Sequence, residues 1–245
     1  MSAQFTKSQQ GCDADYPALS GLGHITADAV LNQITMTNRR VSIGLIDEHG
    51  TIMMMNQFAA RSYGVESPRE MIGREYTDLP HPQWAEELLG YMHQSIENDQ
   101  TVVVLTIKEG HRIQSQVVPI RANQSDTRAS ASLIMCEEIS PETYDLVVST
   151  RSEDRFVVHS KLVGLGPLDV LSRRELEVLA HMRLGLRTKD IAAQLHRSPS
   201  TILRHRESIG KKLGLADRSA IIELANTAVL QFEDAQRTRL LRQAG

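Results

Sequence analysis

Apolar residues in the last third of the chain recur every three or four positions, which is the spacing of one buried face of an α-helix. The pattern predicts four consecutive helices, in the segments 171–185, 188–197, 198–214 and 217–232. In the third segment, Ile202, Ile209 and Leu213 form one apolar stripe that we expect to face a core. In the first segment the inner positions are Leu171, Leu176, Leu179 and either Met182 or Leu184. In the second segment they are Ile191, Ala192 and Leu195.

Residues that favour helix ends lie at the boundaries of these segments. Ser198 is suited to cap the third helix, Pro199 to occupy its first position and Gly214 to follow its last. Ser172, with Glu175 three residues later, forms a capping-box pattern at the start of the first helix. The sequence therefore specifies where these two helices begin and end.

The second and third helices are joined by three or four residues, and the third is rich in cations. Its positive side chains are Arg204, His205, Arg206, Lys211 and Lys212. We expect Thr188 to cap the second helix. A short connection followed by a cationic helix describes a helix-turn-helix, whereas a solvated charged face is the simpler explanation of an isolated basic helix.

The fourth helix is apolar over more of its circumference than packing on one small core requires. Its apolar residues are Ile221, Ile222, Leu224, Ala225, Ala228 and Val229. This surplus suggests a partner surface, such as a second copy of the chain.

The first half of the chain has the pattern of a sheet with helices. Residues 41–56 read as a strand, a tight turn and a second strand, and residues 84–98 have helical spacing. Three strand-like segments follow, at 101–110, 111–121 and 131–139. Between the two halves, residues 141–166 are too apolar for a free tether, and we expect them either to pack on the sheet or to form a two-stranded extension.

Charge separates the two parts. Residues 167–245 hold 14 Lys and Arg against 9 Asp and Glu, a net charge of +5, whereas the other 166 residues hold 13 against 21, a net charge of −8. The C-terminal part can approach a polyanion, and the N-terminal part is repelled by one.

The 245 residues leave room for a sensor-sized domain beside the helical one. The sequence has no apolar run of membrane-spanning length, its N-terminus lacks the apolar core of a signal peptide, and Cys12 and Cys136 form no metal-type cluster. We therefore expect a cytoplasmic protein without a membrane partner. It has no catalytic signature, such as a glycine-rich phosphate loop or a nucleophile triad, so we expect no enzyme.

The run from Leu171 to Ala225 resembles the LuxR-type (GerE-like) DNA-binding domain. The matching residues are Ser172, Arg174, Glu175, Val178, Leu179, Gly185, Ile191, Ala192, Leu195, Ser198, Thr201, His205, Ile209, Lys212, Leu213, Gly214 and Arg218. The resemblance implies double-stranded DNA as a partner, read by a helix that begins near Ser200 and lies in the major groove. A single domain with so small a footprint should bind DNA weakly, so we expect a homodimer, with RNA polymerase as a further partner to consider.

The same resemblance assigns DNA-contacting residues. Thr188, Lys189, Thr201, Lys211 and Lys212 are the phosphate candidates, while Leu203, Arg204 and Glu207, with Ser200 at the start of the helix, face the base edges. Leu203 stands where a lysine is frequent in the family and could instead meet a thymine methyl group. Glu207 could accept from a cytosine amino group or pair with a neighbouring arginine.

Residues 28–140 resemble a PAS domain. The order of two strands, several helices and three strands carries the likeness, together with Gly44, Asp47, Gly50, Asn56, Ala59, Ala60, Gly64, Ile72 and Gly73. The resemblance implies an antiparallel sheet that faces a core or a cavity for an unidentified small-molecule ligand. No cofactor is assigned, because neither cysteine lies in a flavin-photoreceptor motif.

Several residues of this region have a functional and a structural interpretation. His93 is the candidate for a haem ligand, but we prefer a partly exposed polar residue, and we expect His81 in a loop. Residues 53–55, three methionines, are better explained as strand core than as a pocket lining. Trp84 is expected to be a packing anchor that could also report on a ligand by its fluorescence.

Together these patterns predict an α+β chain. We expect an extension at 1–27, a PAS-like sensor at 28–140, a linker at 141–166, a helix-turn-helix domain at 167–232 and a tail at 233–245. The predicted function is sequence-specific transcription regulation under control of the sensor, which either dimerises or binds a signal. The alternatives are an acyl-homoserine-lactone-type quorum-sensing regulator and an interaction adaptor that does not bind DNA.

Overall fold

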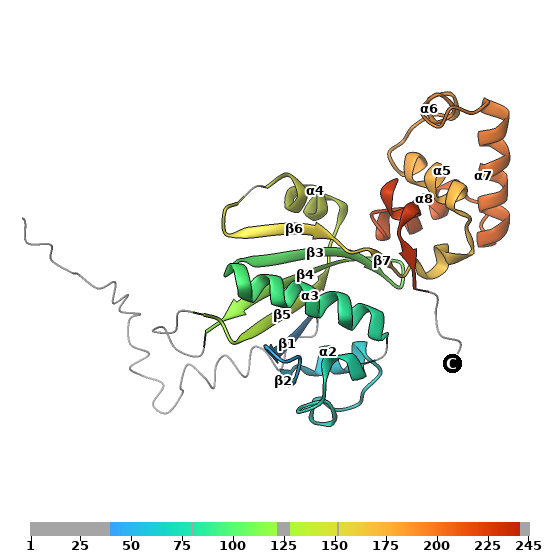
Figure 1. Cartoon of the computed structure of the whole chain (residues 1–245). Helices are drawn as coiled ribbons and strands as arrows, with labels where there is room; N and C mark the ends of the chain where they lie inside the picture. Colours follow the sequence, from blue (N-terminus) through green and yellow to red (C-terminus); the bar gives the residue numbers. More distant parts are fainter. Residues whose placement is uncertain (1–39, 80, 122–127, 151, 241–245) are drawn as a thin grey trace, which may run out of the picture.

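The computed structural model describes residues 40–79, 81–121, 128–150 and 152–240. The predicted extension at 1–27, with Cys12, lies outside the described residues. Figure 1 shows a part built around a sheet, which we call the sensor part, and a helical part beside it.

Most of the strands belong to the sensor part. Its elements are β1 (Val41–Asp47), β2 (Ile52–Met55), α2 (Gln57–Ser62), the 3-10 helices η1 (Pro68–Glu70) and η2 (Tyr76–Asp78), α3 (Pro82–Asn98), β3 (Thr101–Lys108), β4 (His111–Ile120), β5 (Ala131–Glu138), α4 (Pro141–Ser149) and β6 (Arg155–His159). The helical part contains β7 (Leu162–Val163), η3 (Gly166–Val170), α5 (Arg173–Arg183), α6 (Thr188–Gln194), α7 (Pro199–Leu213), α8 (Arg218–Thr227), η4 (Glu233–Gln236) and β8 (Thr238–Arg239). The predicted hairpin, long helix, three closing strands and four C-terminal helices are all confirmed.

The sheet has the strand order β2-β1-β5-β4-β3-β6. Neighbours among the first five strands are antiparallel, which confirms the expected PAS-like sheet. β6 pairs in parallel with β3, with Phe156 opposite Val102, so the complete sheet is mixed. Of the two arrangements expected for residues 141–166, packing on the sheet is the one observed, because β6 extends the edge of the sheet.

The two faces of β3 meet different parts of the molecule, because side chains alternate along a strand. Val102 and Val104 pack in the core beneath α3. Val103 and Leu105 point to the other face, where they pack with residues of α4 and with Val229 of the helical part. α3 therefore packs on one face of the sheet, and α4, together with Val229 just after α8, packs on the other.

The expectation that all three methionines of β2 are core residues is wrong in part. Met55 is buried, but Met53 is 52% exposed. The pairing of β2 with β1 skips Met53, because Leu45 lies opposite Met54 and Ile46 opposite Ile52, so Met53 is the extra residue of a β-bulge at the edge of the sheet.

The helical part has one apolar core, to which α5, α6, α7 and α8 all contribute. Ile202 and Ile209 are completely buried, as the stripe on the third predicted helix requires, and Leu213 packs against the same core. Met182, rather than Leu184, completes the inner face of α5, because Leu184 lies past the last turn and is 60% exposed.

Two local expectations for this part are corrected. Thr188 is the first residue of α6 rather than its cap; Arg187 takes the cap position, and its backbone N–H donates to Asp190 (3.3 Å). Val229, counted in the apolar surplus of the fourth predicted helix, lies past the end of α8, is 1% exposed and packs against the sensor part. That residue needs no second copy to cover it.

Candidate nucleic-acid interface and ligand cavity

Helices α6 and α7 form the predicted helix-turn-helix, and α7 carries an exposed polar face. The described side chains of Lys189, Ser200, Arg204, Glu207, Lys211 and Lys212 are exposed, and Thr188 and Thr201 are half-buried. Leu203 is 49% exposed although it is apolar. In Figure 1, α7 lies on the side of the helical part that faces away from the sheet. The predicted base-reading residues are thus on an open surface.

The N-terminus of α7 is a cluster of hydroxyl groups. The Ser198 Oγ accepts from the Thr201 backbone N–H (3.2 Å), as predicted for the cap, and lies 2.8 Å from the hydroxyls of Ser200 and Thr201. Free backbone N–H groups at a helix start attract anions. This end of α7 is therefore suited to a phosphate contact, which agrees with the role assigned to Thr201.

Lys212 lies at the other end of α7 and is bound to α5. Its Nζ is 2.8 Å from the Oε2 of Glu175, whose side chain is 5% exposed. Glu175 also accepts from the Ser208 hydroxyl (2.6 Å) and closes the predicted capping box with Ser172. Burial alone raises the pKa of Glu175, but the hydrogen bonds from Lys212, Ser208 and Ser172 outweigh it and lower that pKa to about 2. Lys212 is thus a positioned cation, whereas Lys211 makes no such contact in the described part of the chain.

Arg206 connects the two helices of the motif, a role that the sequence pattern did not reveal. Its Nη1 donates to the Thr188 hydroxyl (2.7 Å), so the start of α6 is fixed to the middle of α7. Burial, and then the charge of Arg218, lower the pKa of Arg206. The contact depends on how the two helices cross, which residue spacing within α7 does not encode.

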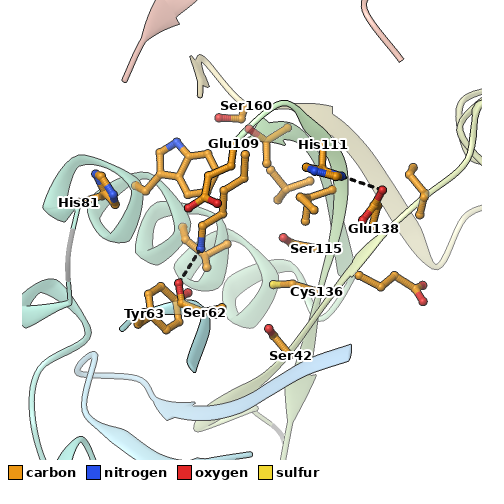
Figure 2. A pocket seen from close by; sticks show the side chains of 18 of the residues that line it. Ser42, Ser62, Tyr63, His81, Glu109, His111, Ser115, Cys136, Glu138 and Ser160 are labelled. Atoms are coloured by element: carbon orange, nitrogen blue, oxygen red, sulfur yellow. Dashed lines mark hydrogen bonds and ion pairs between the residues drawn. The ribbon is translucent and has the colours of Figure 1, made fainter. Parts of the chain in front are cut away.

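The sensor part contains a cavity of about 1120 Å³ between α3 and the sheet. Figure 2 shows Tyr63, Ser115 and Cys136 around it, with His81 at one side and the His111–Glu138 hydrogen bond (2.8 Å) at another. The lining extends to Glu223, Asn226 and Thr227 of α8. The size is that of a site for a small organic molecule.

Lys108 is one of the cations that line this cavity, together with Arg40 and Arg61. Its Nζ lies 4.7 Å from the ring centroid of Tyr63 and 5.6 Å from that of Trp84, which are cation–π distances. Burial lowers the pKa of Lys108 and raises that of Cys136. Trp84 therefore lines the cavity, in addition to packing, and its buried Nε1 has no hydrogen-bond partner among the described residues.

The other candidate residues lie differently. His93 is exposed, outside the cavity lining, with its Nε2 3.3 Å from the Glu48 carbonyl, as its structural interpretation expects. His81 precedes α3 in a left-handed conformation (φ 71°) and lines the cavity. In the described ranges, no group of three or more His, Cys, Asp or Glu side chains could hold a metal ion. No helix in that part of the chain is long and apolar enough to cross a membrane.

Residues 169–225 match the model of the family "Bacterial regulatory proteins, luxR family". These residues carry the LuxR-family helix-turn-helix. The matched residues include all of α5, α6 and α7 and most of α8, and therefore every predicted DNA-contacting residue. The oxygen regulatory protein NreC of Staphylococcus haemolyticus is 35% identical over 88 residues, which are 34% of this chain and 41% of NreC. The same figures hold for NreC of Staphylococcus aureus. The chain thus spans about two fifths of these relatives.

Likeness to solved structures extends beyond the LuxR domain. The VqmA–ligand–DNA complex from Vibrio cholerae aligns with 85% of this chain and 92% of VqmA, with a TM-score of 0.51 and 19% identity. A PAS domain from Colwellia psychrerythraea aligns over 45% of this chain and 97% of its own, with a TM-score of 0.36 and 23% identity. At 19% identity, the VqmA alignment shows a shared fold that extends over both the sensor part and the helical part.

Proposed function

We propose that this protein is a cytoplasmic, sequence-specific regulator of transcription in which α7 enters the major groove of DNA. The observation that carries the proposal is the LuxR-family helix-turn-helix with an exposed α7 face bearing Arg204 and Lys211. Phosphate contacts from Lys189, Thr201 and the N-terminus of α7 would fix the register, and Arg204 and Leu203 would read bases. The protein acts without catalysis, and RNA polymerase is its partner after DNA binding.

The protein acts as a homodimer. A single helix-turn-helix presents one short recognition surface, so useful affinity requires two copies on two half-sites about one helical turn apart. In this proposal the sensor runs from residue 28 to the end of β6. The DNA-binding domain begins at residue 167 and is followed by the tail at 233–245. The segment around β7 joins the sensor to the DNA-binding domain.

The sensor receives a small molecule in the cavity beside Lys108. Support comes from the cavity of about 1120 Å³, from Lys108 and Trp84 in its lining, and from the likeness in fold to VqmA, which was solved with a ligand and DNA. This cavity favours a signal-binding sensor over the adaptor, which needs no cavity. The acyl-homoserine-lactone regulator stays an alternative for the kind of ligand.

Control of DNA binding acts through the arrangement of the two α7 helices in the dimer, and not through covering of α7 by the sensor. Leu203 and Arg204 are already exposed in the described chain, so the acidic sensor does not have to uncover them. The ligand then selects the arrangement in which both α7 helices fit the DNA.

The test is the salt dependence of binding to a pool of random-sequence duplexes, measured by fluorescence anisotropy with the full-length protein. DNA binding through phosphates predicts a steep loss of affinity with added salt, and Lys211→Ala should reduce the slope of log K against log salt by about 1. Arg69→Ala is the matched control, because Arg69 is an exposed cation on the sensor. Absent or salt-insensitive binding would instead support the adaptor.

A further inference from the structure

One arginine of the sensor reaches into the DNA-binding domain. Arg112, on β4, is completely buried. Its Nε donates to the carbonyl of Ala228 (3.1 Å) and its Nη2 to that of Val229 (3.0 Å), just after the last turn of α8. The Nη2 also forms an ion pair with the carboxylate of Asp234. These bonds join residues more than a hundred positions apart in the sequence.

The acceptor side of this contact is itself fixed by hydrogen bonds. Asp234 is completely buried, and it accepts from the Gln231 backbone N–H (2.8 Å) and from the Nη1 of Arg237 (2.8 Å). On the sensor side, the Arg112 guanidinium lies 5.1 Å from the centroid of the Tyr144 ring. Solvent does not screen the pair. Removing the Asp234 charge leaves the guanidinium buried without a carboxylate, and removing the Arg112 charge leaves the buried Asp234 with Arg237 as its remaining cation, so either change carries a large penalty.

The backbone at the contact is strained. Val229 has φ 43°, in the left-handed region that β-branched residues almost never adopt. It is 1% exposed and packs with Val103 and Leu105 of the sensor sheet. Such a conformation persists only where the surroundings enforce it, and here the Arg112 bonds and the apolar contacts do so. Relaxation of Val229 would favour separation of the two domains.

The strand that carries Arg112 also lines the cavity. His111, Ile113 and Ser115 face the cavity, and Arg112 points to the opposite side of the sheet. A shift of β4 on one face therefore moves the guanidinium on the other face, because alternate side chains share one backbone.

We propose that Arg112, Asp234 and Val229 form a latch that fixes the DNA-binding domain on the sensor sheet, and that its opening frees the folded domain to reorient. A closed latch fixes where each α7 points, and an open one leaves the segment around β7 as the attachment about which the domain turns. The consequence for DNA rests on the proposed function, but the latch can be tested without DNA.

The experiment is hydrogen–deuterium exchange of the full-length protein and of Arg112→Met. Loss of the buried charge pair predicts exchange about a hundredfold faster, or more, in residues 228–240, with α5 and α7 protected as before. The matched control is Arg121→Met, which removes an ion pair to Asp99 that is exposed and lies next to the end of the same strand. This control should leave both regions unchanged.

Unchanged exchange at 228–240 in Arg112→Met, or an equal rise in Arg121→Met, would overturn the latch. If Arg112→Met exchanges faster throughout the chain, Asp234→Asn decides the matter, because it keeps the side-chain shape and removes the charge. If the exchange rate of Asp234→Asn rises in residues 228–240 alone, the proposal is supported. A rise throughout the chain, or no rise, overturns it. Each outcome is independent of whether the protein binds DNA.

Discussion

At the residue scale, a single carboxylate organises the contact between α5 and α7. Glu175 accepts hydrogen bonds from Ser172, Ser208 and Lys212, so it caps one helix and positions the other. Its environment favours the charged form strongly enough to lower its pKa to about 2 from an ordinary value of 4.5. The stability of the DNA-binding domain should therefore depend on the ionisation of this group.

A pH titration of stability tests this role. Since the pKa of Glu175 is lowered on folding, its contribution to the free energy of unfolding is complete above about pH 5 and is lost as the pH falls toward 2. The contribution is on the order of 3 kcal/mol. Urea unfolding at several pH values should show that Glu175→Gln is less stable than the parent at pH 7 and that the gap closes in acid.

The control is Glu207→Gln, which removes an exposed carboxylate of α7. Its stability should follow that of the parent at every pH. A gap between the parent and Glu175→Gln that stays constant from pH 7 to pH 2 would contradict the role assigned to Glu175.

At the scale of elements, α7 has a buried face and an exposed face, which we propose to be the DNA-reading one. Ile202 and Ile209 are completely buried against the other helices, while the adjacent Leu203 and Arg204 are exposed. The helical spacing of the apolar stripe separates the two faces. Substitutions at neighbouring positions should therefore affect different properties of the protein.

Ile202→Ala and Leu203→Ala form a matched pair. Ile202→Ala should lower the free energy of unfolding by about 2–5 kcal/mol, because it leaves a cavity in a packed core. Leu203→Ala should change it by less than about 0.5 kcal/mol and should instead alter DNA affinity. Thermal unfolding and duplex binding of both variants separate the effects; equal loss of stability in the two would refute the division into faces.

The helices of the DNA-binding part could be predicted from local sequence patterns, whereas the contacts between elements could not. The capping residues Ser172 and Ser198 and the stripe at Ile202 and Ile209 depend on spacing along one helix, so the sequence was sufficient. Arg112 was not found, because its partners are far away in the chain. The candidate DNA-contacting residues came from family resemblance, and their contacts with DNA stay predictions.

At the scale of the whole molecule, the two domains meet along a packed junction. β7 pairs in parallel with β8, and the Gly110 backbone N–H donates to the carbonyl of Gly164 (3.0 Å). Gly166 is so close to the β3–β4 turn that an added Cβ would lie 2.5 Å from the carbonyl atoms of Glu109. The segment around β7 thus holds the domains together instead of acting as a loose tether.

Gly166→Ala should disrupt this junction. Gly166 and Gly185 both have positive φ, but an added Cβ at Gly185 has nothing within 4 Å. Gly185→Ala should therefore cost only the backbone strain, about 1–2 kcal/mol, whereas Gly166→Ala should cost more because the backbone of Glu109 must move. Chemical unfolding of both variants measures the difference, and equal costs would show that the junction is not tightly packed.

The central claim is that α7 reads a DNA sequence in a dimer, and selection from random duplexes tests it most directly. The full-length protein and Arg204→Ala should be compared at the same salt concentration, after circular dichroism shows that both are folded. The account predicts that the parent enriches an inverted repeat with half-site centres about 10 base pairs apart, and that Arg204→Ala relaxes the preference at one position of each half-site. An enriched sequence that is identical for the parent and Arg204→Ala would contradict it.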